Sequence, residues 1–155
     1  MKANIEQATG NSLSNSSVGA IFFSKNTGRI LFLLRAGNKF ENTWAFVGGR
    51  VERDETRIQA LFREISEEIG ECPEYTKIIP LDQFTNKNKR FEYHTFVIIV
   101  EDEFLPKLNN EHKGYAWTDI ATLPKPLHPG VFSTFKTDEI ADKLKTIEDL
   151  FVNSA

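Results

Sequence analysis

The amino-acid sequence predicts an α+β fold, because strand-like runs stand before, between and after two amphipathic helical stretches. Neither helical stretch looks like the regular crossover that joins parallel strands in a doubly wound sheet. The 155 residues have the size of one domain with one substantial core. Residues 1–17 are polar and rich in Asn and Ser, and we interpret them as a flexible tail or a weak first strand. Residues 18–155 form the predicted domain.

Two strands joined by a hairpin are expected to open the domain. Residues 18–24 are prone to β-structure, and residues 25–28, Lys-Asn-Thr-Gly, carry a turn signal. Residues 29–35 follow as a second, mostly buried strand. After a polar loop over residues 36–43, residues 44–47 form a short aromatic strand that leads into a pair of glycines, which we interpret as a turn.

Residues 56–69 are expected to form a helix. Asp54 or Thr56 can cap its start, and Gly70 stands where a left-handed C-terminal cap belongs. At about 100° per residue, the apolar side chains of this stretch gather on one face that suits the core. These side chains are Ile58, Leu61, Phe62, Ile65 and Ile69.

Two more strands are expected after this helix. Residues 75–84 predict one or two strands, with Pro80 at an edge or a bend. Residues 91–100 are the clearest strand of the sequence, and a basic loop, residues 86–90, precedes them. An acidic, polar loop over residues 101–113 follows.

The last part of the chain predicts a short strand over residues 115–118 and one turn of helix over residues 120–123. Residues 137–151 form the second predicted helix, with an apolar face of its own. Three prolines argue against regular structure between these elements. They are Pro124, Pro126 and Pro129.

Composition narrows the class of protein. The net charge of −3 argues against a general binder of DNA. Cys72 is the single cysteine, which excludes an intrachain disulfide and fits a reducing compartment. No apolar run approaches the ~20 residues of a membrane span, and the N-terminus lacks the basic and apolar regions of a secretory signal. We therefore expect a cytoplasmic protein with no membrane contact.

Three carboxylates form a separate stripe on the first helix. Glu64, Glu67 and Glu68 stand at spacings of i, i+3 and i+4, where like charges destabilise a helix by roughly 0.2–0.5 kcal/mol per pair. Arg63 is the only nearby cation on the helix. Mg²⁺ binds through carboxylates together with substrate phosphates, so the stripe indicates a divalent metal site. A solvated helix rich in Glu is the alternative.

The complete pattern of residues from the glycine pair to the helix end resembles the Nudix box of the Nudix hydrolase superfamily. It covers about a seventh of the chain, and every charged and glycine position of the box is met. Glu71 stands where the family usually has an aliphatic residue, and Val47 where many members have Pro. The pattern runs Gly49, five residues, Glu55, seven residues, Arg63-Glu64-Ile65-Ser66-Glu67-Glu68-Ile69-Gly70.

The resemblance implies the Nudix fold, a mixed β-sheet sandwiched between helices, with Mg²⁺ or Mn²⁺ as cofactor. It also implies that Glu64, Glu67 and Glu68 are metal ligands, joined by the carbonyl of Gly48. The glycines have a physical reason of their own, since they let the backbone approach a ligand closely and take up positive φ. Arg63 is expected to orient the carboxylates, and an ordinary helix ion pair is its alternative role.

The general base has two candidates. Glu64 can activate water directly or through the metal. In several Nudix branches a loop glutamate ahead of a short Trp-containing strand supplies a ligand or base, and Glu111, ahead of Trp117, is similar. Glu101, Asp102 and Glu103 compete with Glu111 for this role. His112 is expected to be an exposed loop residue.

Four residues are predicted to contact the substrate. Arg35 ends a strand before the variable loop, where relatives often place a cation near phosphate, and Arg50 follows the glycine pair. Phe46 is one of several aromatic residues near the expected cleft that can stack on a base. His128 stands in a loop stiffened by prolines.

The predicted function is divalent-metal-dependent hydrolysis of the pyrophosphate linkage in a nucleoside diphosphate linked to another group. Nucleotide sugars, nucleoside triphosphates and dinucleoside polyphosphates remain open as substrates. The alternatives are a non-catalytic Nudix-like module that binds a nucleotide or metabolite, and an RNA 5′-end pyrophosphohydrolase. Many relatives in this superfamily form dimers, so a homodimer is also possible.

Overall fold

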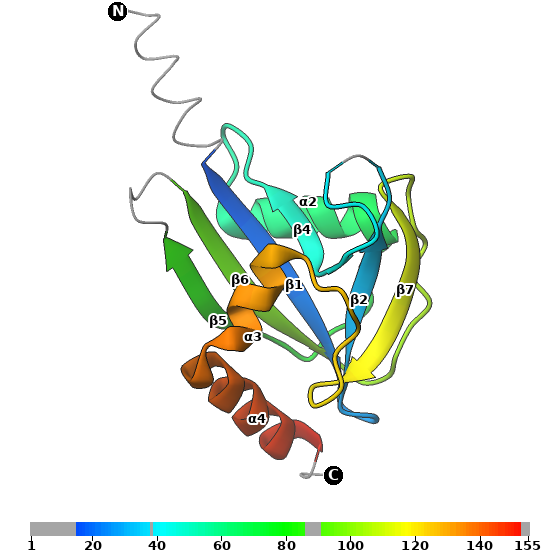
Figure 1. Ribbon diagram of the computed structural model, residues 1–155, viewed down its shortest axis with the longest axis vertical. Helices are drawn as coiled ribbons and strands as arrows, with labels where there is room; N and C mark the ends of the chain where they lie inside the picture. The colour runs from blue at the N-terminus through cyan, green and yellow to red at the C-terminus, as the bar shows by residue number, and fades with distance from the viewer. Residues whose placement is uncertain (1–14, 38, 86–90, 153–155) are drawn as a thin grey trace, which may run out of the picture.

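A computed structural model describes residues 15–37, 39–85 and 91–152 of the chain (Figure 1). Most of the predicted tail and the whole predicted basic loop lie outside these residues. Within them, no helix is both long enough and apolar enough to cross a membrane.

The centre of the fold is a seven-stranded mixed sheet. Its main path runs in the order β3-β2-β1-β6-β5, while β4 pairs with β1 and β7 with β2. The β1–β6 pair is parallel and the other pairs are antiparallel. The strands are β1 (Ser16–Ser24), β2 (Arg29–Arg35), β3 (Trp44–Ala45), β4 (Val47–Arg50), β5 (Lys77–Thr85), β6 (Glu92–Val100) and β7 (His112–Asp119).

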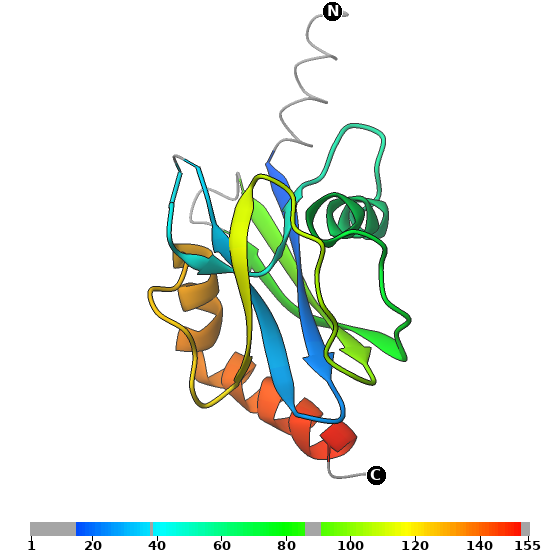
Figure 2. The ribbon, with the colours of Figure 1, turned by 90° about the vertical axis from the view of Figure 1, so that its right-hand side faces the viewer.

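Helices cover both faces of the sheet, as predicted (Figures 1 and 2). One face packs on α2 (Arg57–Ile69), and the other packs on α3 (Pro129–Lys136) and α4 (Asp138–Val152). Side chains alternate along β1, so that Phe22 belongs to the core under α2 and Phe23 to the core under α3 and α4. The predicted α+β fold with a sheet between helices is confirmed.

Helix α2 is capped by Thr56, one of the two predicted caps, and its first turn forms a capping box. The Thr56 hydroxyl accepts a hydrogen bond from the Gln59 amide, and the Gln59 side chain accepts one from the Thr56 amide. Gly70 ends the helix with a φ of 88°, although its ψ of −153° lies outside the left-handed helical well. The predicted faces of the helix need two corrections: Ile58 is exposed, and Glu68 is buried among the core residues.

Three other predictions about elements were wrong. The aromatic strand of residues 44–47 is two strands, and the glycine pair continues the second strand instead of turning. Residues 120–123 form a turn and not a helix. Helix α3 was missed, because Pro129 marks its first turn, where the absent amide hydrogen costs nothing.

Candidate active site

The glycine pair lies in β4, which runs antiparallel to β1 and places Gly48 beside Gly19. Neither Gly48 nor Gly49 has a positive φ, so the predicted conformational reason for them is wrong. The reason is space. A Cβ on Gly48 would lie 2.1 Å from the Val18 carbonyl oxygen, and one on Gly49 would lie 2.3 Å from a carboxylate oxygen of Glu64.

Arg63 is the centre of a network of carboxylates at the start of α2. Its guanidinium binds both oxygens of Glu55, at 2.5 and 3.0 Å, and donates at 2.9 Å to Glu64. It also donates at 3.4 Å to Glu67 and at 2.8 Å to the Arg50 carbonyl. The Glu55 bonds hold the pKa of that carboxyl below its usual range. Arg63 therefore ties the helix to the strand before it and orients two carboxylates of the stripe.

The carboxylates of the stripe differ in burial. Glu68 is 3% exposed, and the Gly48 amide donates a 3.0 Å hydrogen bond to it. Burial, with Glu64 and Glu111 nearby, raises the pKa of Glu68 to about 8. Burial also raises the pKa of Glu64, against the opposing bond from Arg63. Glu67 is exposed. The stripe thus holds buried carboxyl groups whose ionised form a cation would stabilise.

Glu111 lies close enough to the stripe to raise the pKa values of Glu64 and Glu68. It stands just before β7, and its carbonyl accepts a hydrogen bond from the Ala36 amide. Asn109 holds this loop in place, because its side chain donates at 2.9 Å to the Glu67 carbonyl and accepts at 3.0 Å from the Glu111 amide. Sequence patterns alone do not predict this role of Asn109.

The three competitors of Glu111 are bound elsewhere. Glu101 pairs with Lys25, Asp102 accepts a hydrogen bond from Asn26, and Glu103 pairs with Arg29. All three partners lie at the β1–β2 hairpin. The structure therefore brings Glu111, and not these residues, to the carboxylate stripe.

His112 differs from its prediction. It is the first residue of β7 and is 5% exposed, so it is a buried strand residue and not an exposed loop residue. Burial lowers its pKa to about 4, with a smaller effect from Arg35. His112 is therefore neutral at physiological pH.

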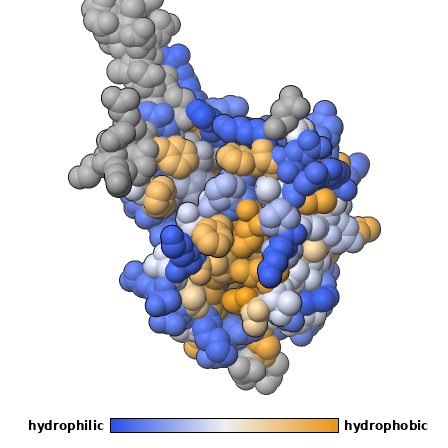
Figure 3. Space-filling view, viewed as in Figure 1, coloured by the Kyte–Doolittle hydropathy of each residue, from blue (hydrophilic) through white to orange (hydrophobic). Residues whose placement is uncertain are grey.

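A cleft of about 790 Å³ opens next to α3, on a face where apolar and polar side chains interleave (Figure 3). Its lining includes Gly48, whose amide binds Glu68 of the stripe. Its size is that of a small-molecule site. At one end it reaches Gly48 and Gly49, and its wall continues over β5, β6 and α3. The lining includes cationic side chains and the rings of Phe and Tyr residues. They are Arg35, Lys39, Arg50 and Lys136, and Phe40, Phe46, Phe84, Phe91 and Tyr93.

The four predicted substrate contacts all line this cleft. Arg35 lies within electrostatic reach of Glu68, and Arg50 follows the glycine pair. Phe46 is 5% exposed and packs on Phe32 and Phe135, so it is mainly a core residue at the cleft wall. His128 caps α3 by accepting a hydrogen bond from the Gly130 amide.

The match to a family model now adds to this geometry. Residues 13–137 match the model described as the NUDIX domain, which is most of the chain. The chain belongs to the Nudix family. The Nudix domain extends from before β1 to the end of α3, so it includes both the carboxylate stripe and the cleft.

Named relatives of this Nudix chain are hydrolases. It is 30% identical over 114 residues to mRNA-decapping enzyme subunit 2 of Saccharomyces cerevisiae, covering 71% of the chain and 11% of that protein. It is 29% identical over 119 residues to dihydroneopterin triphosphate diphosphatase of Haemophilus influenzae, covering 67% of the chain and 73% of that protein. These hydrolases and the family model support the predicted enzyme class, a hydrolase acting on pyrophosphate bonds.

A solved structure also supports membership of the Nudix family. A MutT structure from work on the proteins of Aliivibrio salmonicida and Vibrio cholerae superimposes with a TM-score of 0.64 at 26% identity, over 82% of this chain and 97% of that one. The predicted membership of the MutT-like Nudix hydrolases is therefore confirmed.

The side chains and backbone of this Nudix site offer carboxylate and carbonyl oxygens. A hard divalent cation prefers oxygen ligands of these types. Among the described residues, no three His, Cys, Asp or Glu side chains converge closely enough to hold a metal ion. Glu64 and Glu67 each form an ion pair with Arg63, at 2.9 and 3.4 Å. Glu68, in contrast, joins none of the ion pairs within the described ranges, although it is buried beside two other carboxylates.

Proposed function

We propose that this protein hydrolyses the pyrophosphate linkage of a nucleoside diphosphate linked to another group, with Mg²⁺ or Mn²⁺ as cofactor. One observation supports this most strongly. The buried Glu68 carboxyl group, beside Glu64 and Glu111, accepts a hydrogen bond from Gly48, and Gly48 lines a cleft whose charged side chains are mainly cationic. Such a cleft attracts a polyanion, and such carboxylates favour a cation.

Each part of the site has a role in this proposal. Gly48, Glu64, Glu67 and Glu68, with Glu111, supply oxygen ligands for the divalent ion. The bound ion would supply Lewis-acid activation and charge neutralisation at the phosphates. Glu64 or Glu111 accepts the proton of the attacking water.

The substrate phosphates are placed against the cations of the cleft. Arg35 and Arg50 line it and bind phosphate oxygens in this proposal. Arg63 holds the carboxylates in position through the bonds described above. The aromatic lining, including Phe46 at the wall, accommodates the apolar or planar part of the substrate.

A substrate panel tests the proposal. Purified protein is incubated with Mg²⁺ and nucleoside triphosphates, nucleotide sugars, ADP-ribose and dinucleoside polyphosphates, and the products are identified by mass spectrometry. Cleavage between phosphorus atoms, abolished by EDTA and absent from Glu68→Gln protein, is the expected result. Binding of these compounds without cleavage would contradict the proposal and favour the non-catalytic module.

RNA 5′ ends are a second candidate substrate, favoured by the 30% identity to a decapping enzyme subunit. Triphosphorylated and capped RNA oligonucleotides of the same sequence provide the test. Release of diphosphate or a capped nucleotide at rates above those for free GTP would favour RNA. Cleavage of GTP alone would favour the free nucleotide.

A further inference from the structure

A row of paired residues crosses the sheet from the glycine pair to the far wall of the cleft. Gly48 pairs with Gly19, Gly19 pairs with Thr95, and Thr95 pairs with Asp82, on β4, β1, β6 and β5 in turn. Neighbouring strands lie about 4.8 Å apart, so Asp82 stands about 14 Å from Gly48. An extended nucleoside polyphosphate spans such a separation, with its phosphates at Gly48 and its ring at Asp82.

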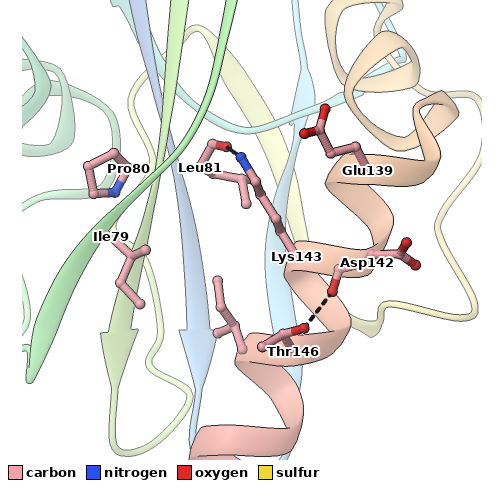
Figure 4. A pocket seen from close by; sticks show the side chains of 8 residues that line it. Ile79, Pro80, Leu81, Glu139, Asp142, Lys143 and Thr146 are labelled. Atoms are coloured by element: carbon pink, nitrogen blue, oxygen red, sulfur yellow. Dashed lines mark hydrogen bonds between the residues drawn. The ribbon is translucent and has the colours of Figure 1, made fainter.

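The position of Asp82 is fixed by a bulge in β5. The register of β5 against β6 shifts between Pro80 and Asp82, which leaves Leu81 as the extra residue. The Leu81 side chain is buried in the core under α4. Its carbonyl accepts a 3.3 Å hydrogen bond from Lys143 of α4, in a separate hollow of about 400 Å³ (Figure 4). Core packing of its side chain and the hydrogen bond from α4 to its carbonyl thus fix Leu81, the residue just before Asp82.

Asp82 stands out among the charged groups of the cleft. It is half-buried, and it is the sole carboxylate among the described residues that line the cleft. No hydrogen bond or ion pair engages it within the described ranges. A carboxylate repels substrate phosphates, so in a cleft that binds a polyanion it must face the uncharged part of the ligand.

Aromatic rings lie beside this row, two residues along β5 and β6 from Asp82 and Thr95. Tyr93 and Phe84 are paired across β6 and β5, and Phe91 stacks on Tyr93 with ring centroids 6.4 Å apart. All three line the cleft. The Tyr93 hydroxyl lies over Gly19, where a Cβ would come within 2.2 Å of it. A planar heterocycle placed against these rings would present its edge to the β5 wall.

A carboxylate binds best to two adjacent N–H donors, which it accepts with its two oxygens. Among the common bases, guanine alone offers such an edge, through its ring N1–H and its 2-amino group. The same 2-amino-4-oxopyrimidine edge occurs in pterins. Adenine and cytosine place an acceptor beside their amino group, and uracil flanks its N–H with two carbonyls.

We propose that Asp82 selects substrates whose ring carries this 2-amino-4-oxopyrimidine edge, so that guanine or pterin triphosphates are preferred over adenine nucleotides. The inference rests on the proposed hydrolase function. Asp82 acts as a specificity-determining residue and takes no part in the bond cleavage.

Steady-state rates with GTP, ITP, ATP and dihydroneopterin triphosphate test the proposal. ITP lacks only the 2-amino group, so wild-type kcat/KM for GTP should exceed that for ITP and for ATP by at least about 10-fold. Asp82→Asn should lower kcat/KM for GTP by about 10-fold or more and leave ATP unchanged. Asp119→Asn, on β7, is the matched control and should keep the wild-type preference. A wild-type preference for ATP, or an equal loss on all substrates in Asp82→Asn, would overturn the proposal.

Binding measurements distinguish failure of this proposal from failure of the hydrolase proposal. If no substrate is cleaved, thermal stabilisation by Mg²⁺ with a non-hydrolysable GTP or ATP analogue still reports the preference. Stabilisation by the GTP analogue that Asp82→Asn removes would support Asp82 while the hydrolase proposal fails. Faster cleavage of dihydroneopterin triphosphate than of GTP would assign the pterin ring, and the reverse would assign guanine.

Discussion

The Gly48 amide donates a 3.0 Å hydrogen bond to the Glu68 carboxylate, and this bond joins β4 to α2 at the centre of the Nudix site. When Glu68 is ionised, this bond is charge-assisted and about twice as strong as a neutral one. The bond also fixes where the buried carboxylate lies relative to the cleft. The box glycines and the box glutamates are therefore parts of one structure, although 20 residues separate these two in sequence.

The two box glycines should respond differently to alanine. In Gly48→Ala the new Cβ meets the backbone oxygen of Val18, which cannot move without disturbing β1, so we expect a lower melting temperature. In Gly49→Ala the Cβ meets the end of the Glu64 side chain, which can rotate away. That variant should stay folded and lose most of its activity. Calorimetry and substrate turnover on both variants measure the contrast, and equal destabilisation would contradict it.

Glu67→Gln should abolish most turnover while the fold is kept. Glu67 is exposed, so its substitution disturbs no core packing. Since even the outer partners of metal ligands are worth about 10–100-fold in activity, loss of a ligand should cost more than about 100-fold in kcat. Glu71→Gln, an exposed residue just after α2, is the matched control. Near wild-type activity of Glu67→Gln at saturating Mg²⁺ would show that the ligand assignment is wrong.

Asn109→Ala should reduce activity by misplacing Glu111. Without the amide, the loop loses its bonds to the Glu67 carbonyl and the Glu111 amide. We expect a decrease of about 10-fold or more in kcat, at the level of other groups that orient a site. Asn110→Ala, the exposed neighbour, should leave kcat unchanged. A double variant with Glu111→Gln should lose little more than Glu111→Gln alone, and fully additive losses would refute a shared role.

Local patterns explain what could be predicted. The periodicity of residues 56–69 gave α2, and the turn at residues 25–28 gave the β1–β2 hairpin, because these features depend on neighbours in sequence. The order of the box residues predicted the family. Helix α3 was missed because proline interrupts a helix in its interior but is favoured at its first position, where Pro129 stands.

Contacts between distant segments explain what could not be predicted. The space requirement at Gly48 comes from Val18, and the loop position of Glu111 comes from the bond between Asn109 and Glu67, 42 residues apart. The burial of Glu68 also depends on strands that the helix pattern does not contain. A helical wheel therefore placed Glu68 in the carboxylate stripe, apart from the apolar face, although its surroundings are those of the core.

The burial of Glu68 should make the metal-free protein sensitive to pH. Its pKa rises from 4.5 to about 8 on folding, mainly because burial disfavours the charged form. The folded state therefore holds a proton that the unfolded state releases between these values. Stability from this group is fully present below about pH 4.5 and is lost as the pH rises through 8.

Glu68→Gln removes this titration, so it should change how stability depends on pH. In EDTA, we expect the melting temperature of the variant, relative to wild type, to rise by several degrees between pH 5 and pH 8.5, since 1 kcal/mol is worth about 2–4 °C at this size. Glu71→Gln should parallel the wild type throughout. Because Mg²⁺ favours the ionised carboxylate, it should stabilise wild type more at pH 8.5 than at pH 5, with little effect on Glu68→Gln. If the melting temperatures of Glu68→Gln and wild type changed equally with pH, burial would not raise the pKa of this carboxyl group, and the expected metal-binding role of Glu68 would lose its support.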